Sequence, residues 1–391
     1  MGYLPEDESR ARIRGVREIM GSRKIDIALV YYDEFNIGNG WYLTGWCPQF
    51  ESGAVLVPRK GDPLLLGGPE SEPFARLDSA VKDTRNFPVF MVPDEEYPNA
   101  DITDFPALRK ELEDVMGKIS RVGLVGGGRM PAECYKQLEE GFGETELVDI
   151  TEEFISLRFI KSDWERKQIR SAFALADHCY DAMRSAVTPG ASEISVAAEG
   201  EYAARSRGAS GFGFTAIVGS GPRSSAVVPT ASSRKMEDGE MVMIGLSPRV
   251  NGYCGVIGDT LPVSGSCSTS QRECISHLRE AFRLTRDQLV PGRTGREIDA
   301  PARNYFEEVG LSRYLVCPFA HTIGLHEAES PFFGPGSHDE LRPGMTVCID
   351  VSFFGHPDWN GVRIETGYEI TGEGAVPLSP RLDAIHSSEN G

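Results

Sequence analysis

The stretch His321-Thr322-Ile323-Gly324-Leu325-His326-Glu327 decides the fold of this chain, together with two segments that follow it. These segments are Leu341-Arg342-Pro343-Gly344-Met345 and Gly361-Val362-Arg363-Ile364-Glu365. Between them, the apolar run Val347-Cys348-Ile349-Asp350-Val351 carries a carboxylate, which is costly to bury unless it is paired or hydrogen-bonded. These residues therefore indicate a polar site in the C-terminal third of the chain.

In this order and at this spacing, the segments resemble the creatinase/prolidase family, which includes methionine and Xaa-Pro aminopeptidases. The resemblance implies an α/β protein with two domains. The first is a creatinase-like α/β domain over residues 1–155. The second is a catalytic α+β domain of the pita-bread fold over residues 156–391, which in this family consists of two halves related by a pseudo-twofold axis.

The metallopeptidases of this family hold two metal ions with two aspartates, one histidine and two glutamates. The resemblance places His321 at the position of the histidine. It places Asp350 at the position of one glutamate, with a side chain shorter by one methylene, and Glu365 at the position of the other.

The two aspartate positions of the family are not acidic in this chain. The turn Asn251-Gly252-Tyr253 anchors the match, and it puts Gly245 at the first aspartate position and Val256 at the second. Neither side chain can bind a metal ion. We therefore expect a divergent member of the family without a two-metal centre and without a cofactor. The alternative is one divalent metal ion on the three remaining ligands.

The resemblance implies a creatinase-like, metal-independent hydrolase that cleaves a C–N bond in a small amino-acid-derived substrate. Creatine itself is not the expected substrate, because two positions that creatinase uses fall on Val228 and Gly258. The alternatives are a peptidase of the Xaa-Pro dipeptidase or aminopeptidase type with a reduced single-metal site, and an inactive binding module or a lyase.

We expect His321 to act as the general acid/base, because imidazole titrates near neutral pH. Asp350 and Glu365 are the other predicted catalytic residues, and the same two residues with His321 are the only predicted metal ligands. The residues predicted to bind the substrate are His326, Asp259, Tyr253, Arg363 and Phe50. A strand ion pair between Arg363 and Glu365 is also expected, since side chains two residues apart share one face of a strand.

The composition limits the classes of partner. The chain has 58 acidic and 40 basic residues and a net charge of −18, which would repel a phosphate backbone and argues against a nucleic-acid partner. No apolar run is long enough to span a membrane, and the eight cysteines form no CxxC pair. We expect a cytoplasmic protein that acts on a small molecule. The resemblance implies a homodimer in which the loop that contains Phe50 closes the cleft of the partner.

Local patterns predict the secondary structure. We expect a helix over residues 9–21, strands over 25–32 and 122–125, two strands within 53–66 and a helix over 131–141. Ser162 and Glu165 predict a capping box at the start of a long helix. The segments 188–194 and 290–298 are similar, because each contains a Pro-Gly turn followed by a Ser or Thr. This similarity favours a second domain made of two related halves.

Overall fold

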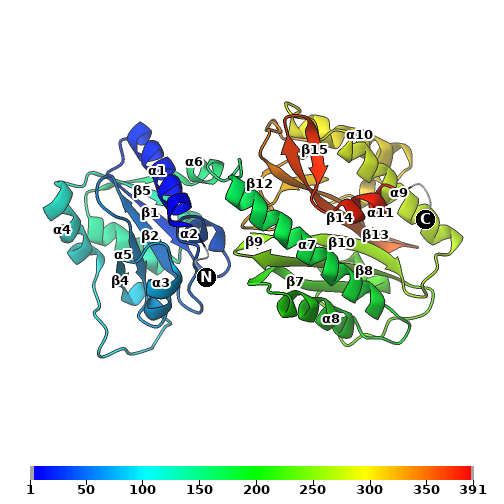
Figure 1. The fold of residues 1–391 in the computed structure, drawn as a ribbon, viewed down its shortest axis with the longest axis horizontal. Helices are drawn as coiled ribbons and strands as arrows, with labels where there is room; N and C mark the ends of the chain where they lie inside the picture. Colours follow the sequence, from blue (N-terminus) through cyan, green and yellow to red (C-terminus); the bar gives the residue numbers. More distant parts are fainter. Residues whose placement is uncertain (1–3, 389–391) are drawn as a thin grey trace. The chain divides into compact units, whose positions relative to one another are not determined.

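The computed structural model describes residues 4–388 and divides into two compact units, Met1–Arg158 and Phe159–Gly391. This division falls close to the boundary expected after residue 155. The two units contain one β-sheet each, and both sheets are covered by helices (Figure 1). The predicted α/β architecture is thus confirmed for both parts of the chain.

The first unit is built on a six-stranded mixed sheet with the strand order β4-β3-β2-β1-β5-β6. The strand β1 pairs in parallel with β5 and antiparallel with β2, and all of its residues are buried. The strands are β1 (Ile27–Tyr32), β2 (Gly53–Pro58), β3 (Leu64–Gly67), β4 (Thr84–Asn86), β5 (Arg121–Val125) and β6 (Glu146–Asp149). The helices are α1 (Glu6–Arg23), α2 (Ile37–Thr44), α3 (Glu72–Asp78), α4 (Phe105–Met116), α5 (Ala132–Phe142) and α6 (Thr151–Ser156).

The second unit is built on a nine-stranded sheet whose main path is β12-β11-β13-β14-β10-β8-β7. The strands are β7 (Gly211–Ser220), β8 (Met241–Val250), β9 (Tyr253–Cys254), β10 (Ile257–Pro262), β11 (Ala320–Thr322), β12 (Glu329–Phe332), β13 (Thr346–His356), β14 (Asn360–Thr371) and β15 (Gly374–Pro377). The helices are α7 (Asp163–Ala186), α8 (Glu193–Ser206), α9 (Thr269–Arg286), α10 (Gly295–Glu308) and α11 (Pro380–His386).

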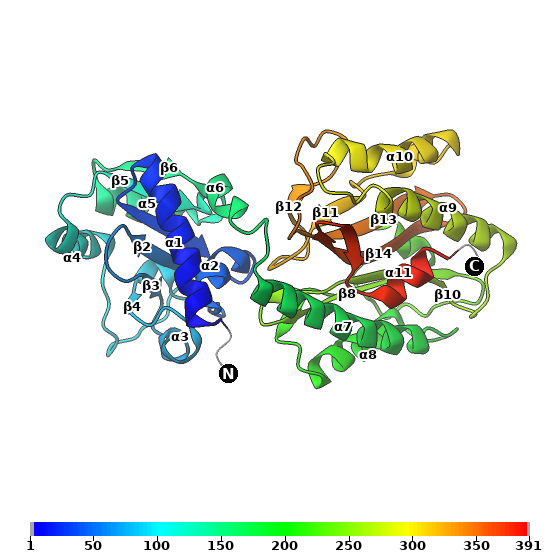
Figure 2. The same cartoon turned by 45° about the horizontal axis from the view of Figure 1, so that its top comes forward.

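Two hydrophobic clusters divide the second unit into halves. In the first half, α7 and α8 pack on β7, β8 and β10, and in the second half α9 and α10 pack on the strands around β13 and β14 (Figures 1 and 2). Val242, Ile244 and Leu246 of β8 point into the first cluster. Because side chains alternate along a strand, the residues between them, including Gly245, face the opposite side of the sheet.

The repeat seen in the sequence corresponds to a repeated turn in the structure. Gly190 and Gly292 both have positive φ, and their amides donate to the carbonyls of Met236 and Leu341 over 2.8 Å in each case. Each turn is followed by a capping box, at Ser192 before α8 and at Thr294 before α10. Equivalent hydrogen bonds in equivalent places confirm the two pseudo-twofold halves.

Two further local predictions are confirmed. Ser162 caps α7, its hydroxyl accepts from the Glu165 amide over 3.2 Å, and the Glu165 carboxylate accepts from the Ser162 amide over 2.9 Å. The Asn251-Gly252 turn has positive φ at both residues and joins β8 to β9, as expected for a tight hairpin. Among residues 4–388, no helix combines the length and apolar character that crossing a bilayer requires.

Glu193, the first residue of α8, holds the start of that helix against the sheet through a fully buried carboxylate. It accepts hydrogen bonds from Ser220 (N, 2.9 Å; Oγ, 2.8 Å), from Ser232 (N, 3.1 Å; Oγ, 2.6 Å) and from Arg223 Nε over 2.9 Å. Burial opposes ionisation, but these donors outweigh it and hold the pKa of Glu193 below its usual value.

We expect Glu193→Gln to lower the free energy of unfolding by about 2–4 kcal/mol at pH 7, because an amide nitrogen would then face buried donors. A depressed carboxyl pKa stabilises the fold above the unfolded pKa, and this contribution disappears as the pH falls through the folded pKa. Denaturant unfolding at several pH values should therefore show that the difference in unfolding free energy between the wild type and Glu193→Gln becomes smaller below about pH 4.5. Glu199→Gln, an exposed position on α8, is the control, and an equal loss there would contradict this role.

Candidate active site

One face of the second sheet carries a row of residues that are paired across neighbouring strands. Ile217 pairs with Gly245, Gly245 with Gly258, Gly258 with Glu365, and Glu365 with Asp350. Residues directly opposite each other in antiparallel strands point to the same side of a sheet. The row therefore presents an apolar side chain, two glycines and two carboxylates to one face.

His321 joins the acidic end of this row from β11, where it pairs with Cys348 of β13. Its Nδ1 lies 3.1 Å from the carbonyl oxygen of Thr322, so Nδ1 carries a proton and Nε2 faces the carboxylates. His321 Nε2 is 3.6 Å from Glu365 Oε1 and 3.7 Å from Glu327 Oε1. The fold thus brings together His321, Asp350 and Glu365, the three residues predicted to be catalytic, and all three are buried.

Arg363 lies on the same face as Glu365 but pairs with a different residue from the one expected. Its Nε donates to Asp350 Oδ1 over 3.0 Å, and another guanidinium nitrogen donates to the Val227 carbonyl over 3.2 Å. The ion pair of Arg363 therefore runs across the strands to Asp350, and the expected pair with Glu365 along the strand is not formed.

The charges of this cluster oppose and balance one another. Burial disfavours protonated His321, but the facing carboxylates of Glu365, Glu327 and Asp350 raise its pKa to about 9. Burial also disfavours ionised Glu365, yet His321 and Arg363 lower its pKa. Asp350 has a raised pKa because burial and the charge of Glu365 outweigh Arg363. A protonated histidine and an arginine thus face two carboxylates.

Glu327 is a member of the cluster that the sequence did not single out. Burial raises the pKa of its carboxyl well above the usual value, and the charge of Glu365 adds to this shift. This shift favours the protonated form of Glu327 beside His321. A glutamate in a loop is a common feature, so only its place six residues after His321 could have indicated this role.

Gly245 and Val256, which stand where the family has aspartates, have no free space beside them, and neither does Gly258, the other glycine of the row. A Cβ atom on Gly245 would lie 2.9 Å from Cγ1 of Ile217, so the isoleucine occupies the space into which an aspartate would extend. A Cβ atom on Gly258 would lie 2.8 Å from Cβ of Glu365 and 3.2 Å from Cδ of Arg363. Val256 is fully buried. The residues present therefore do not fit a two-metal centre.

A single cation fits the donor set better. His321 Nε2 and one carboxylate oxygen each from Asp350 and Glu365 lie within 4.8 Å of one another. No donor among residues 4–388 is hydrogen-bonded to the buried Oε1 of Glu365. A histidine whose second ring nitrogen is bound by a backbone carbonyl, with two carboxylates, is the ligand pattern of catalytic single-metal sites.

The structure does not bring Asp259 to this cluster, which corrects the predicted site. Gly258 faces Glu365, so the next residue along β10 points to the opposite face. There the Asp259 carboxylate accepts a hydrogen bond from the Tyr180 hydroxyl of α7 over 2.7 Å. Tyr253 also differs from the prediction, because its buried hydroxyl donates to Glu165 Oε1 of α7 over 2.9 Å.

The last two predicted substrate contacts lie outside the cluster of three. His326 is half-buried in the turn after β11, and its amide lies 3.5 Å from Glu329 Oε2. Phe50 belongs to the first unit, is 80% exposed and has a φ of 65°. The proposed contacts of His326 and Phe50 with substrate stay predictions.

Comparison with known proteins agrees with this architecture. The model of Metallopeptidase family M24 matches residues 167–372, and the model of the Creatinase/Prolidase N-terminal domain matches residues 12–160. The chain is 34% identical over 249 residues to YqhT, an uncharacterized peptidase of Bacillus subtilis. The aligned residues make up 63% of this chain and 70% of that protein. It is 29% identical over 375 residues to the Xaa-Pro dipeptidase of Pyrococcus horikoshii. That alignment includes 95% of this chain and 98% of the dipeptidase.

Solved structures give the same result. The crystal structure of the prolidase from Pyrococcus horikoshii matches with a TM-score of 0.80 and 26% identity over 94% of this chain and 97% of that one. The chain belongs to Metallopeptidase family M24, with a creatinase/prolidase N-terminal domain. It is an enzyme of the hydrolase class that acts on C–N bonds, and the predicted pita-bread fold is confirmed.

We expect Gly245→Asp to lower the free energy of unfolding by at least about 2 kcal/mol, because the new side chain would collide with Ile217 and bury an unpaired carboxylate. Denaturant titration of the purified variant measures this loss. Gly372→Asp is the control, since Gly372 is exposed and a Cβ atom there would meet no atom within 4 Å. A Gly245→Asp protein as stable as the wild type would contradict the filled pocket.

Proposed function

We propose that this enzyme is a dipeptidase-type hydrolase that cleaves the amide C–N bond of a small peptide and uses one divalent cation. The observation that supports the proposal is the buried donor set of His321, Asp350 and Glu365, in which one Glu365 oxygen lacks a hydrogen-bond donor among the described residues. Family membership and relatives named as Xaa-Pro dipeptidase and probable dipeptidase favour a peptide substrate.

In this proposal His321, Asp350 and Glu365 hold the cation. When bound, it supplies a Lewis acid that polarises the scissile carbonyl and lowers the pKa of water. Arg363 holds Asp350 in place through its 3.0 Å hydrogen bond and balances the charge of that carboxylate. Glu327 carries a proton on a carboxyl with a raised pKa, and it can donate this proton to the leaving amine.

The burial of Glu365 and His321 supports the roles proposed for the residues of the cluster. A proton transfer between Glu327 and a leaving amine occurs in a site from which the surrounding sheet excludes water, because Glu365 and His321 are both buried. Low local dielectric strengthens the interactions of these groups with the charge that develops in the transition state. The homodimer and the cytoplasmic location expected from the sequence belong to this proposal as well.

We expect the purified enzyme to bind no more than one manganese, cobalt or zinc ion per chain, because Gly245 and Val256 offer no ligand. Elemental analysis after dialysis measures the stoichiometry, and hydrolysis of Xaa-Pro and other dipeptides measures activity. His321→Ala should lose the ion and lower kcat/KM by at least about 100-fold. His338→Ala, an exposed position, is the control. Two ions per chain would contradict the proposal.

A second candidate function is a metal-independent, creatinase-like hydrolysis of a C–N bond in a small amino-acid derivative. The charge balance of the cluster favours it, because His321 with a pKa of about 9 and Arg363 together neutralise Glu365 and Asp350 without a cation. In this case protonated His321 is the general acid.

Chelation separates the two candidates. If the single-metal proposal holds, chelator-treated enzyme should lose at least about 90% of its activity, and one equivalent of a divalent ion should restore it. If the metal-independent candidate holds, activity on small amidine, urea or amide derivatives of amino acids should survive chelation and still be lost in His321→Ala. Activity that survives both chelation and His321→Ala would reject the two candidates together.

A further inference from the structure

Arg249 lies near the end of β8, on the face of the sheet that carries the cluster around His321. Leu246 of the same strand belongs to the hydrophobic cluster under α7 and α8. Because side chains alternate along a strand, Arg249, three residues further on, points to the opposite face. Arg249 also pairs with Cys254 of β9, and residues directly opposite each other in antiparallel strands share a face. The face of the active site thus carries a second arginine besides Arg363.

The side chain of Cys254 connects Arg249 with the active-site cluster. The Cys254 thiol donates to the carbonyl oxygen of Leu325 over 3.8 Å, two residues before Glu327. A Cβ atom on Gly213 would lie 2.9 Å from Cys254 Sγ and 3.1 Å from Cβ of Glu327, so these two side chains converge on the same point. Arg249 and Glu327 both act on the charge of the Cys254 thiol, so both lie near it.

No acidic side chain balances the charge of Arg249. Within residues 4–388, Arg249 forms no ion pair with a carboxylate, and its buried Nε has no hydrogen-bond partner. Burial raises the pKa of the Cys254 thiol although Arg249 opposes the shift, so the thiol is neutral at pH 7 and offers no counter-charge. Arg363 differs, because it is bound to Asp350. A half-buried guanidinium without a counter-ion is costly, and an anionic ligand would compensate for this cost.

Glu327 relates the position of Arg249 to the proposed reaction. The carboxyl end of Glu327 faces His321, with 3.7 Å between Oε1 and His321 Nε2, and its Cβ end approaches Cys254. The proposed function assigns to Glu327 the proton for the leaving amine. In a dipeptide, the leaving amine and the free carboxylate belong to one amino acid and are separated by a single carbon atom. A carboxylate beyond the leaving amine would therefore lie toward Cys254 and Arg249.

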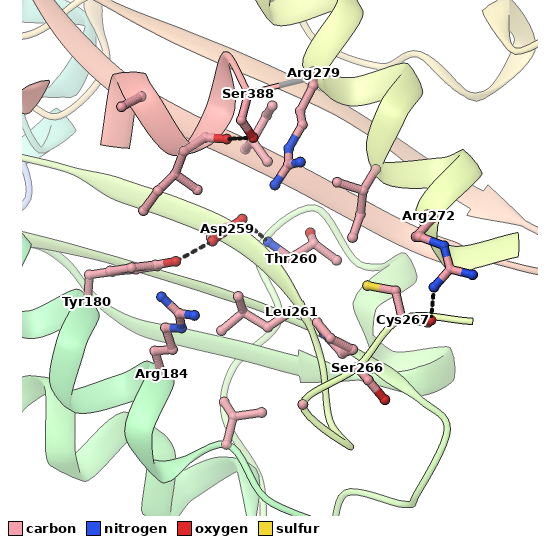
Figure 3. Close-up of a pocket in the computed structure, with 17 residues that line it drawn as sticks. Tyr180, Arg184, Asp259, Thr260, Leu261, Ser266, Cys267, Arg272, Arg279 and Ser388 are labelled. Carbon is pink, nitrogen blue, oxygen red and sulfur yellow. Dashed lines mark hydrogen bonds between the residues drawn. The ribbon is translucent and has the colours of Figure 1, made fainter. Parts of the chain in front are cut away.

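The charged groups on the helix-covered face cannot contact the same substrate. Asp259 of β10 lies on that face, and the Tyr180 hydroxyl and the Thr260 amide donate to its two oxygens over 2.7 and 2.8 Å (Figure 3). Arg184 of α7 borders the same cavity. Since the sheet lies between this cavity and the active-site cluster, recognition of the substrate depends on groups on the face of Arg249.

We propose that Arg249 binds the free carboxylate of the substrate and so restricts the enzyme to dipeptides, against longer peptides and C-terminal amides. This inference rests on the proposed hydrolysis of a small peptide. The planar guanidinium group matches the geometry of a carboxylate, and hydrogen bonds between two charged groups are stronger than those between neutral groups. A longer peptide would place a neutral amide against Arg249 and leave its charge unbalanced. Arg249 is therefore a residue that determines specificity.

Calorimetric titration of the chelator-treated full chain tests the inference without turnover. The ligands are alanyl-proline and alanyl-leucine, each as the free acid and as the C-terminal amide. We expect at least one acid to bind at one molecule per chain and about tenfold or more tightly than its amide, because only the acid forms a charged pair with Arg249. Arg249→Gln should bind the acid and the amide with similar affinity.

Steady-state kinetics of the metal-loaded enzyme with the same compounds tests the consequence for catalysis. Arg249→Gln should lower kcat/KM for the acid by about tenfold or more, mainly through a higher KM, and should leave kcat/KM for the amide unchanged. Arg293→Gln is the matched control, because it removes the same charge from an exposed position in the turn before α10. It should change neither binding nor kinetics.

The outcomes separate this inference from the proposed function. Equal affinity of the wild type for acid and amide, no binding of either dipeptide, or a preference for the acid that survives Arg249→Gln would overturn the inference. Hydrolysis of acid and amide with equal kcat/KM would reject it and support the hydrolase. Binding that depends on both the carboxylate and Arg249, without hydrolysis, would reject the hydrolase and support recognition of a free carboxylate.

Discussion

The pairing of Asp350 with Glu365 across β13 and β14 is the constraint on which the site depends. It places two buried carboxylates opposite each other inside a sheet, where like charges repel and solvation by bulk water is largely lost. The fold compensates with Arg363 on Asp350 and with His321 beside Glu365. The buried negative charge contributes to the raised pKa of His321, and together with burial it raises the pKa of Glu327.

Two glycines determine the shape of the rest of the row. Gly245 leaves space that Ile217 fills, and Gly258 lets the aliphatic part of Arg363 approach β10. The sheet is therefore closed by hydrocarbon on the side where metallopeptidases of this family carry aspartates. This packing leaves His321, Asp350 and Glu365 as the candidate metal ligands of the site, which suits one cation or none.

Much of the fold could be predicted because its signals are local. Ser162 with Glu165 gives a capping box and Asn251-Gly252 gives a hairpin turn in any context that allows helix and strand. Asp259 was expected beside the other two carboxylates, but it lies on the opposite face of the sheet. Strand alternation could have indicated this, because Asp259 directly follows Gly258. The raised pKa of Glu327 could not be predicted, because it depends on how the loop that carries it folds against the buried strands of the site.

The repeated turns at Gly190 and Gly292 show that the second unit consists of two similar halves, yet the two halves contribute differently to the site. His321, Asp350 and Glu365 all come from the later half, whereas the earlier one supplies Ile217 and Gly245 to the same row. The ionisable groups therefore come from one half, and the other half supplies hydrocarbon that fills the neighbouring space on the same face of the sheet.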